Sequence, residues 1–258
     1  MSQIEKQRVW VSGTPRLWRY NPIGARQCAG CHSPIVERII CEVIEEMGIE
    51  GNVICVTGIG CSALANFLFD FDSLKVAHGR PVDAATGVKR ALRGRPVVFT
   101  LQGDGDCIGL GGGALISAAS RAEKITVIMA NNAVYGQTRG QMAPTTLVGQ
   151  VTTTTPFGRS PAEHGYPIHT AELVAQIKGT AYSVRTAVNN PANYQRTKKY
   201  LKTAFQKQID NVGFTFVEIL EACPTLWRMS PVESLKWLEE VLMAEFPLGE
   251  FKNVDKIE

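Results

Sequence analysis

Apolar positions fall into two patterns that alternate along most of the chain. Short continuous runs rich in Val, Ile, Thr and Phe are typical of strands that are buried on both faces. Longer segments repeat their apolar residues at the spacing of one helix face. The predicted strands cover 52–57, 75–78, 96–103, 124–132, 181–187 and 213–223, and the predicted helices cover 34–47, 81–93, 110–121, 170–179 and 190–210.

This alternation predicts the fold class. Neighbouring parallel strands need a long crossover connection, and a helix is the usual one. We therefore expect an α/β protein with a three-layer architecture, in which a parallel sheet carries helices on both faces. Pro34 and Pro191 stand in the first turns of two predicted helices, and Asn189 or Asn190 is a suitable N-cap for the second.

The loops with unusual composition follow the predicted strands. They read GIGCSA, HGRP, GDGDCIGLGGG, NNAVYGQTRG and EACPTLW. The carboxyl ends of parallel strands meet at one edge of a sheet, where open α/β folds bind their ligands. We expect these loops to gather at that edge and to form a site.

Composition narrows the classes of protein. Of the 258 residues 45% are hydrophobic and 20% charged, which is ordinary for a soluble domain. A net charge of +3 gives no argument for nucleic acid. No apolar run approaches the roughly 18 residues that span a bilayer, so we expect no membrane contact. The first residues lack the apolar core of a signal peptide, and a cytoplasmic location is expected.

The GDG and NN segments are candidates for a metal and phosphate site. Gly103 and Gly105 allow backbone N–H groups to approach a phosphate at the start of a helix. Asp104 is a poor partner for phosphate unless a divalent cation lies between them, and Mg²⁺ prefers such oxygen ligands. Asn131 and Asn132 end the next predicted strand and add oxygens. The alternative is two ordinary turns, since Gly, Asp and Asn are common turn residues.

The chain contains seven cysteines, an odd number, without an export signal. A disulfide scaffold is therefore improbable, and metal ligation gains weight. Cys28 and Cys31 form a CxxC pair, while Cys61 and Cys223 are distant single residues. Four thiolates suit either a tetrahedral zinc or a [4Fe–4S] cluster, and spacing alone does not separate the two. The remaining cysteines are expected to be packed in the core, Cys107 being the least certain of them; they are Cys41, Cys55 and Cys107.

Taken together, these segments resemble the beta subunit of the 2-oxoacid:ferredoxin oxidoreductases, a branch of the thiamine-diphosphate enzymes. GDG followed by NN is similar to the thiamine-diphosphate motif itself. The family usually reads CPGCGH at the first cysteine pair, whereas this chain reads CAGCHS, so we expect differences in the local turn and in the solvent cover of the cluster. The matching segments follow the family's order and are CAGC (28–31), TGIGCS (57–62), HGRPVDAATGVKRAL (78–92), GDGD (103–106), NNAVYGQTRGQMAPTT (131–146) and CPT (223–225).

The resemblance implies roles for particular residues. The Mg²⁺ ligands would be Asp104, Asn132 and the carbonyl of Val134, and a [4Fe–4S] cluster would be held by Cys28, Cys31, Cys61 and Cys223. His78 is alternatively a loop histidine that bonds to backbone. The implied contacts with thiamine diphosphate are Ile59, Gly60, Cys61, Ser62, His78, Gly79, Arg80, Pro81, Gly103, Gly105, Asp106, Asn131, Gly136 and Gln137.

The resemblance also implies an activity and partners. The expected reaction is oxidative decarboxylation of a 2-oxoacid with coenzyme A, which yields acyl-CoA and CO₂ and passes electrons through the cluster to ferredoxin or a related acceptor. The glutamate that activates thiamine is expected on an alpha subunit with the pyrimidine module, beside gamma and ferredoxin-like delta subunits. The implied domains are an N-terminal arm (1–27), a thiamine-diphosphate and [4Fe–4S] domain (28–225) and a C-terminal helical extension (226–258).

Three points stay open at the level of sequence. Residues 136–161 and 231–252 are candidate docking surfaces, although the second is equally suited to pack on its own domain. No cation follows Cys61 in the chain, which favours a monocarboxylic 2-oxoacid with an apolar or aromatic side chain, although Arg139 lies nearby. The alternatives to the expected function are a non-oxidative thiamine-diphosphate decarboxylase or synthase subunit and a zinc-stabilised scaffold subunit.

Overall fold

A single sheet organises the protein. The structure, a computed structural model, describes residues 13–19 and 27–257, so most of the predicted N-terminal arm lies outside the described residues. Within the described part, seven strands pair in the order β2-β1-β3-β4-β8-β7-β9, and only β9 runs antiparallel to its neighbour. The strands are β1 (Val53–Thr57), β2 (Asp72–Lys75), β3 (Val97–Gly103), β4 (Thr126–Asn131), β7 (Thr180–Ala187), β8 (Phe214–Leu220) and β9 (Gly249–Asn253).

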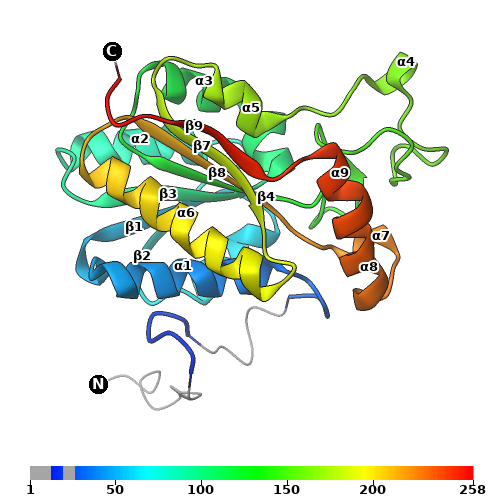
Figure 1. The fold of residues 1–258 in the computed structure, drawn as a ribbon, viewed down its shortest axis with the longest axis horizontal. Coiled ribbons are helices and arrows are strands. Elements are labelled where there is room, and N and C mark those ends of the chain that lie inside the picture. Colours follow the sequence, from blue (N-terminus) through cyan, green and yellow to red (C-terminus); the bar gives the residue numbers. More distant parts are fainter. Residues whose placement is uncertain (1–12, 20–26, 258) are drawn as a thin grey trace.

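Helices cover both faces of the sheet (Figure 1). One face is packed by α1 and α6, and the other by α2, α3 and α5. This confirms the predicted three-layer α/β architecture. The helices are α1 (Ser33–Met47), α2 (Pro81–Ala91), α3 (Gly112–Ser120), α4 (Pro161–His164), α5 (Thr170–Ala175), α6 (Pro191–Ile209), α7 (Pro224–Trp227), α8 (Pro231–Trp237) and α9 (Met243–Glu245).

Alternate residues of each strand supply the two apolar layers. In β3, Phe99 and Leu101 join the cluster under α1 and α6, while Val98 joins the cluster under α2 and α3. Successive side chains of a strand point to opposite faces, so a strand covered on both faces reads as a continuous apolar run. For this reason the strands can be predicted from the sequence.

Helix α6 begins as its sequence predicts. Pro191 occupies the first turn, and the Asn190 side chain accepts a hydrogen bond from the N–H of Asn193 at 2.9 Å. This cap satisfies a donor that the first turn of a helix leaves unpaired. Leu201 and Phe205 then face the sheet and are fully buried.

Three predicted elements differ in detail from the structure. The strand predicted at 75–78 lies earlier in the chain, at β2. This strand pairs with β1 and forms an exposed edge of the sheet. The helix predicted from 110 begins as a π-helical turn (Gly105–Leu110), in which the N–H of Gly111 bonds to the carbonyl of Asp106 at 3.0 Å. The loop predicted at 136–161 contains part of a short hairpin, β5 (Val134–Tyr135) and β6 (Gln141–Met142).

The C-terminal segment is part of the same packed unit. The predicted C-terminal helical extension (226–258) contains α8 and α9 and also a strand, β9, which joins the edge of the sheet beside β7. Leu238, Leu242 and Phe246 are fully buried against the chain's own core. Part of the apolar stripe therefore packs on its own domain, whereas Val232 is 79% exposed, and docking of this segment on a partner stays a prediction.

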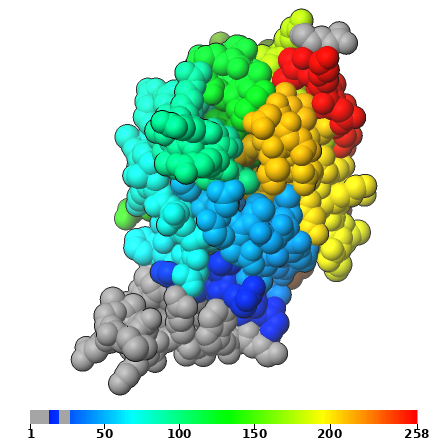
Figure 2. Space-filling view, turned by 90° about the vertical axis from the view of Figure 1, so that its left-hand side faces the viewer, coloured from blue at the N-terminus to red at the C-terminus, as the bar shows by residue number. Residues whose placement is uncertain are grey.

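The strand order creates a crevice at one edge of the sheet. After β1 the chain continues to β2 on one side of it, and after β3 the chain continues to β4 on the other side, so the loops that leave β1 and β3 diverge. Such a switch point is where open α/β sheets bind ligands. The opposite edge faces the viewer in Figure 2, where the red C-terminal segment after β9 lies beside the green and orange segments.

No helix in the described part of the chain is long and apolar enough to span a membrane.

Candidate active site

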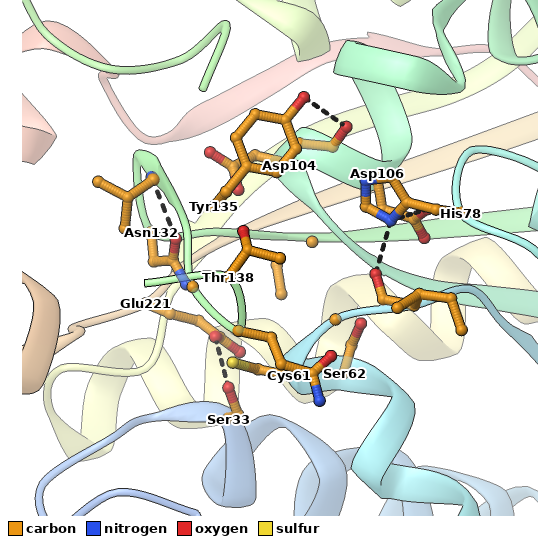
Figure 3. Close-up of a pocket in the computed structure, with 18 residues that line it drawn as sticks. Ser33, Cys61, Ser62, His78, Asp104, Asp106, Asn132, Tyr135, Thr138 and Glu221 are labelled. Atoms are coloured by element: carbon orange, nitrogen blue, oxygen red, sulfur yellow. Dashed lines mark hydrogen bonds and ion pairs between the residues drawn. The ribbon is translucent and has the colours of Figure 1, made fainter. Parts of the chain in front are cut away.

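A cavity of about 270 Å³ opens at the carboxyl edge of the sheet (Figure 3). Ligand pockets usually measure roughly 300–1,000 Å³, so this cavity suits part of a cofactor-sized molecule. Its walls come from the loops after β1, β2, β3, β4 and β8 and from the start of α1. The residues that line it are Ser33, Ile59, Gly60, Cys61, Ser62, His78, Gly103, Asp104, Gly105, Asp106, Ala130, Asn132, Val134, Tyr135, Gly136, Gln137, Thr138 and Glu221.

Asp104 ends β3 and brings a buried carboxyl group to the cavity. The side chain is 1% exposed, and its Oδ2 accepts a hydrogen bond from the Thr145 hydroxyl. Burial raises the pKa of Asp104 to about 7, although the Thr145 bond opposes the rise. A carboxylate is costly in such a place unless a cation lies beside it.

Asn131 anchors the loop that follows β4. Its Nδ2 donates to Glu218 Oε1 at 2.7 Å, and its Oδ1 accepts from the N–H of Ala133 at 3.0 Å. Glu218 and Arg185, both with fully buried side chains, form an ion pair at 2.9 Å. Ala133 has a left-handed backbone with φ of 58°, which is uncommon for a residue with a Cβ. The buried network therefore holds the loop in an unusual conformation.

Asn132 is the asparagine that faces the cavity. Its Oδ1 accepts from the N–H of Val134 at 3.2 Å, and its carbonyl accepts from Trp227 Nε1 at 3.0 Å. Val134 lines the cavity as well. The two asparagines of the NN pair thus differ, since Asn131 lies fully buried outside the lining and fixes the loop.

Gly105 allows the backbone to approach the cavity closely. A Cβ at this position would lie 2.2 Å from the Tyr135 ring, whose hydroxyl donates to the Gly105 carbonyl at 3.3 Å. A side chain would have to displace the ring. Glycine at this position follows from packing, which the sequence pattern alone did not reveal.

Asp106 holds a neighbouring loop. Its Oδ1 accepts from the N–H of Gly79 at 2.5 Å and lies 3.1 Å from His78 Nδ1, while Oδ2 accepts from Gln102 at 3.1 Å. His78 Nδ1 also lies 2.7 Å from the Ile59 carbonyl, so its proton is on Nδ1 in the neutral form. His78 thus bonds to backbone and also lines the cavity, and its contact with the cofactor stays a prediction.

Some predicted contacts do not line the cavity. Arg80 and Pro81 begin α2 outside the lining, and Gly79 contributes the backbone that Asp106 binds. Gly79 has φ of 76°, and a Cβ there would lie 2.8 Å from the Leu110 backbone. Residues 79–81 therefore support the cavity lining without being part of it.

Of the four cysteines predicted as metal ligands, only Cys61 lines the described cavity. Burial is the main cause that raises the pKa of Cys31 to about 11 and those of Cys61 and Cys223 to about 12. Cys28 and Cys31 each add to the rise at Cys61, and Cys31 and Cys61 add to the rise at Cys223, so Cys61 and Cys31 lie within electrostatic reach of the other predicted ligands. In the described part of the chain, no group of three or more His, Cys, Asp or Glu residues is arranged to hold a metal ion.

The other three cysteines are packed in the core as predicted. Cys41 and Cys55 belong to the cluster under α1 and α6, and Cys107 belongs to the opposite cluster. All three are fully buried and free.

Four polar residues that line the cavity were not predicted from the sequence: Ser33, Tyr135, Thr138 and Glu221. The Ser33 hydroxyl donates to Glu221 Oε2 at 2.8 Å. Burial raises the pKa of Glu221 to about 7. The sequence positions of Ser33 and Glu221 could have indicated them, because Ser33 lies two residues after Cys31 and Glu221 lies two residues before Cys223.

Comparison with known proteins extends these observations. Residues 52–219 match the family described as thiamine pyrophosphate enzyme, C-terminal TPP binding domain. The ketoisovalerate oxidoreductase subunit VorA of Methanothermobacter marburgensis is 40% identical over 232 residues, covering 90% of this chain and 48% of the relative. The chain thus spans about half the length of that relative.

A second relative is matched over most of its length. The 2-oxoglutarate synthase subunit KorB of Methanothermobacter thermautotrophicus is 38% identical over 223 residues, covering 83% of this chain and 72% of the relative. A solved 2-oxoglutarate:ferredoxin oxidoreductase from Magnetococcus marinus aligns with a TM-score of 0.76 over 94% of this chain and 86% of that chain. At 22% identity this likeness shows the shared fold. The chain belongs to the thiamine pyrophosphate enzymes, among the beta subunits of the 2-oxoacid:ferredoxin oxidoreductases.

Proposed function

We propose that this chain is the thiamine-diphosphate-binding subunit of a complex that oxidatively decarboxylates a 2-oxoacid with coenzyme A. The products are acyl-CoA and CO₂, and electrons leave through a [4Fe–4S] cluster to ferredoxin or a related acceptor. The observation that carries the proposal is a cavity at the switch point of the sheet. Asp104, Asn132 and Cys61 all line this cavity.

The oxygens at one side of the cavity fit a magnesium diphosphate. Asp104 supplies a buried carboxyl group, and Asn132 and Val134 add amide and carbonyl oxygens, the ligands that Mg²⁺ prefers. Gly103, Gly105, Gly136 and Gln137 line the same wall and would contact the diphosphate. Ile59, Gly60 and Ser62 would contact the rest of the cofactor. When bound, thiamine diphosphate supplies the electron sink for cleavage beside a 2-oxo group.

The protein's own residues would bind and orient the cofactor. The Thr145 hydroxyl fixes the Asp104 carboxyl group, and the Thr146 hydroxyl donates to the Ala133 carbonyl at 2.6 Å. Both threonines come from one loop, so this loop clamps the loops after β3 and β4 together. Such fixed geometry favours reaction because bound groups need not be reorganised.

Four free cysteines support the proposal of a [4Fe–4S] cluster on this chain; they are Cys28, Cys31, Cys61 and Cys223. Burial raises the pKa values of Cys31, Cys61 and Cys223, and a bound metal would favour their thiolate forms. Zinc and a [4Fe–4S] cluster would use the same four sulfurs, so metal analysis separates this proposal from a zinc-stabilised scaffold.

We propose that partner subunits complete the site. The match of this chain is to the C-terminal TPP binding domain, and the glutamate that activates thiamine is assigned to an alpha subunit with the pyrimidine module. Gamma and ferredoxin-like delta subunits are proposed to complete the electron path. The loop from Gly136 to Pro161 leads from the cavity to the surface and carries Phe157, whose side chain is fully exposed. We assign this loop to contact with the alpha subunit.

The substrate proposed is a monocarboxylic 2-oxoacid with an apolar or aromatic side chain. No Lys or Arg lines the described cavity, and Arg139 is outside its lining. A second carboxylate would need such a cation. One of the relatives described above is named for ketoisovalerate and the other for 2-oxoglutarate. The lining of this cavity favours a monocarboxylic acid such as ketoisovalerate.

Anaerobic purification of the complex with its partners tests the function. We expect about four irons and four sulfides per copy of this chain. Loss of this iron and sulfide in the Cys223→Ala variant would assign the cluster to this chain. We also expect bound thiamine diphosphate and viologen reduction that depends on coenzyme A and on a branched-chain or aromatic 2-oxoacid. Iron that is unchanged in Cys223→Ala places the cluster on another subunit. Zinc without iron, or activity without coenzyme A, contradicts the proposal.

A further inference from the structure

Glu221 is a buried carboxyl group that none of the proposed roles above uses. Its side chain is 2% exposed and lines the cavity beside Cys61, away from Asp104 (Figure 3). Ser33 holds Oε2 at 2.8 Å. The other oxygen, Oε1, has no hydrogen-bond partner among the described residues. An unpaired buried carboxyl oxygen is costly, so its position indicates a partner on the molecule that fills the cavity.

The other carboxyl groups of the cavity have their partners. Asp106 is bonded to Gly79, Gln102 and His78. Asp104 accepts from Thr145 and would bind the metal ion. No Lys or Arg lines the described cavity, so Glu221 has no cation from the chain itself. A cationic group on the ligand would complete its contacts.

Thiamine diphosphate carries such a cation in its thiazolium ring, which a short alkyl link joins to the diphosphate. With the diphosphate at Asp104 and Asn132, the ring would reach the adjoining part of the cavity, where Glu221 lies. Asp104 is close enough to Glu221 to influence it electrostatically, which agrees with one ligand that spans both. We propose that Glu221, positioned by Ser33, contacts the organic half of the bound cofactor and balances the positive charge of its thiazolium ring.

This inference rests on the proposed function, and a comparison of two ligands tests it. The complex is depleted of cofactor and titrated, with Mg²⁺ present, with thiamine diphosphate or with thiamine thiazolone diphosphate, whose ring is neutral. Binding is measured by calorimetry. Glu221→Gln keeps the shape of the side chain and removes the charge. We expect it to weaken binding of the cationic ligand by about tenfold and binding of the neutral ligand by less than about twofold.

Matched variants separate this role from general effects on the fold. Glu37 is also buried, has an unpaired oxygen and lies close enough to Glu221 that the Glu221 carboxylate raises its pKa, but it does not line the cavity. Glu37→Gln should leave the ratio of the two affinities unchanged. Glu221→Asp keeps the charge and should retain part of the preference, and Ser33→Ala should reduce the preference less than Glu221→Gln does.

Three outcomes overturn the inference. Glu221→Gln that leaves both affinities unchanged shows that the ring does not contact this side chain. Equal weakening of both ligands assigns Glu221 to the shape of the cavity. A wild-type complex that binds neither ligand overturns the proposed function and the inference with it, and that result is distinguishable because it needs no variant.

Discussion

At the scale of single residues, Gly105 shows how the backbone is brought to the cavity. Its missing side chain leaves room for the Tyr135 ring, which covers the turn that follows Asp104. A Cβ at 2.2 Å from the ring forces Tyr135 or the turn to move. The glycine therefore determines the shape of the wall on which the diphosphate is proposed to lie.

Gly105→Ala is expected to weaken binding of thiamine diphosphate by at least about tenfold, because displacements of the order of 1 Å in a site have effects of this size or more. Calorimetric titration of the depleted complex measures the loss. Gly113→Ala serves as control, since a Cβ there meets nothing within 4 Å. Adding Tyr135→Ala to Gly105→Ala should restore part of the affinity. A Gly105→Ala protein with wild-type affinity contradicts the role of this close approach.

The buried Arg185–Glu218 pair connects the sheet to the Asn131 loop. Arg185 lies on β7, Glu218 on β8 and Asn131 on β4, and Arg185 also reaches Glu172 at 2.8 Å. Removing one partner of a buried ion pair strands the other charge. The pair is therefore expected to matter both for stability and for the loop that Asn131 fixes.

Arg185→Met should lower the free energy of unfolding by about 3–5 kcal/mol, because Glu218 loses its buried counter-charge. Urea unfolding monitored by circular dichroism measures the change. Adding Glu218→Gln should recover part of the loss, since a neutral amide needs no counter-charge and its oxygen still accepts from Asn131. A double variant whose loss equals the sum of the two single losses would argue against this coupling.

At the scale of elements, helix α2 carries a buried lysine. Lys89 is 6% exposed, and its Nζ donates to the Pro96 carbonyl at 2.6 Å and to Gln208 Oε1 at 3.3 Å. Burial lowers the pKa of Lys89 from 10.5 to about 8. The ammonium thus joins α2 to the start of β3 and to α6, at the cost of a charge in a poorly solvated place.

This pKa shift predicts how stability depends on pH. Between about pH 8 and pH 10.5 the unfolded chain keeps the Lys89 proton and the folded chain loses it. The unfolded state then binds more protons, so on this account the free energy of unfolding rises with pH across the window and is lower below it. The contribution is on the order of 1–3 kcal/mol.

Urea unfolding at several pH values in this window measures the effect. Lys89→Met should remove the part of the rise in unfolding free energy that Lys89 causes. Lys75→Met, at an exposed position, should leave this rise in place. Equal slopes for the wild type and Lys89→Met would contradict the assignment.

The sequence predicted most elements because each is legible in one dimension. Strands covered on both faces read as apolar runs, and Asn190 with Pro191 marked the start of α6. The predictions failed where distant parts of the chain decide the outcome. β9 follows helices and is half exposed, so only its pairing with β7 makes it a strand. The π-helical turn after Asp104 depends on Gly111 lying against the Asp106 carbonyl.

The site was predictable in the same measure. The motifs named Asp104, Asn132 and Val134, and the structure brings them to one cavity. No motif indicated that Asn131 turns to Glu218 and that Asp106 turns to Gly79, because those partners come from other loops. Glu221 and Ser33 are distant in the chain, and only folding makes them neighbours.

At the scale of the whole molecule, the loop around Phe157 is the proposed contact with the alpha subunit. Arg159 of this loop is buried and donates to the carbonyl of Pro144 within the loop and to the carbonyls of Gly165 and Tyr166 just after it. A braced loop presents its apolar side chains without further loss of conformational freedom on binding. Phe157 is fully exposed, and Tyr166 is 73% exposed.

Phe157→Ser should weaken assembly of the complex by about tenfold or more and leave the stability of the chain unchanged. Size-exclusion chromatography of mixed subunits over a concentration series measures assembly. Ile209→Ser, an exposed apolar position at the end of α6, is the control and should assemble normally. Normal assembly of Phe157→Ser would place the contact elsewhere.

The central claim is that the loops after β3 and β4 hold a divalent metal ion together with the diphosphate of thiamine diphosphate. Mn²⁺ in place of Mg²⁺ makes this site visible to electron paramagnetic resonance. In the wild type, we expect a single tight Mn²⁺ that requires thiamine diphosphate. Asp104→Asn should lose at least about tenfold in Mn²⁺ affinity, whereas Asp83→Asn, at an exposed position of α2, should not. Tight cofactor-dependent Mn²⁺ binding that persists in Asp104→Asn would contradict the account.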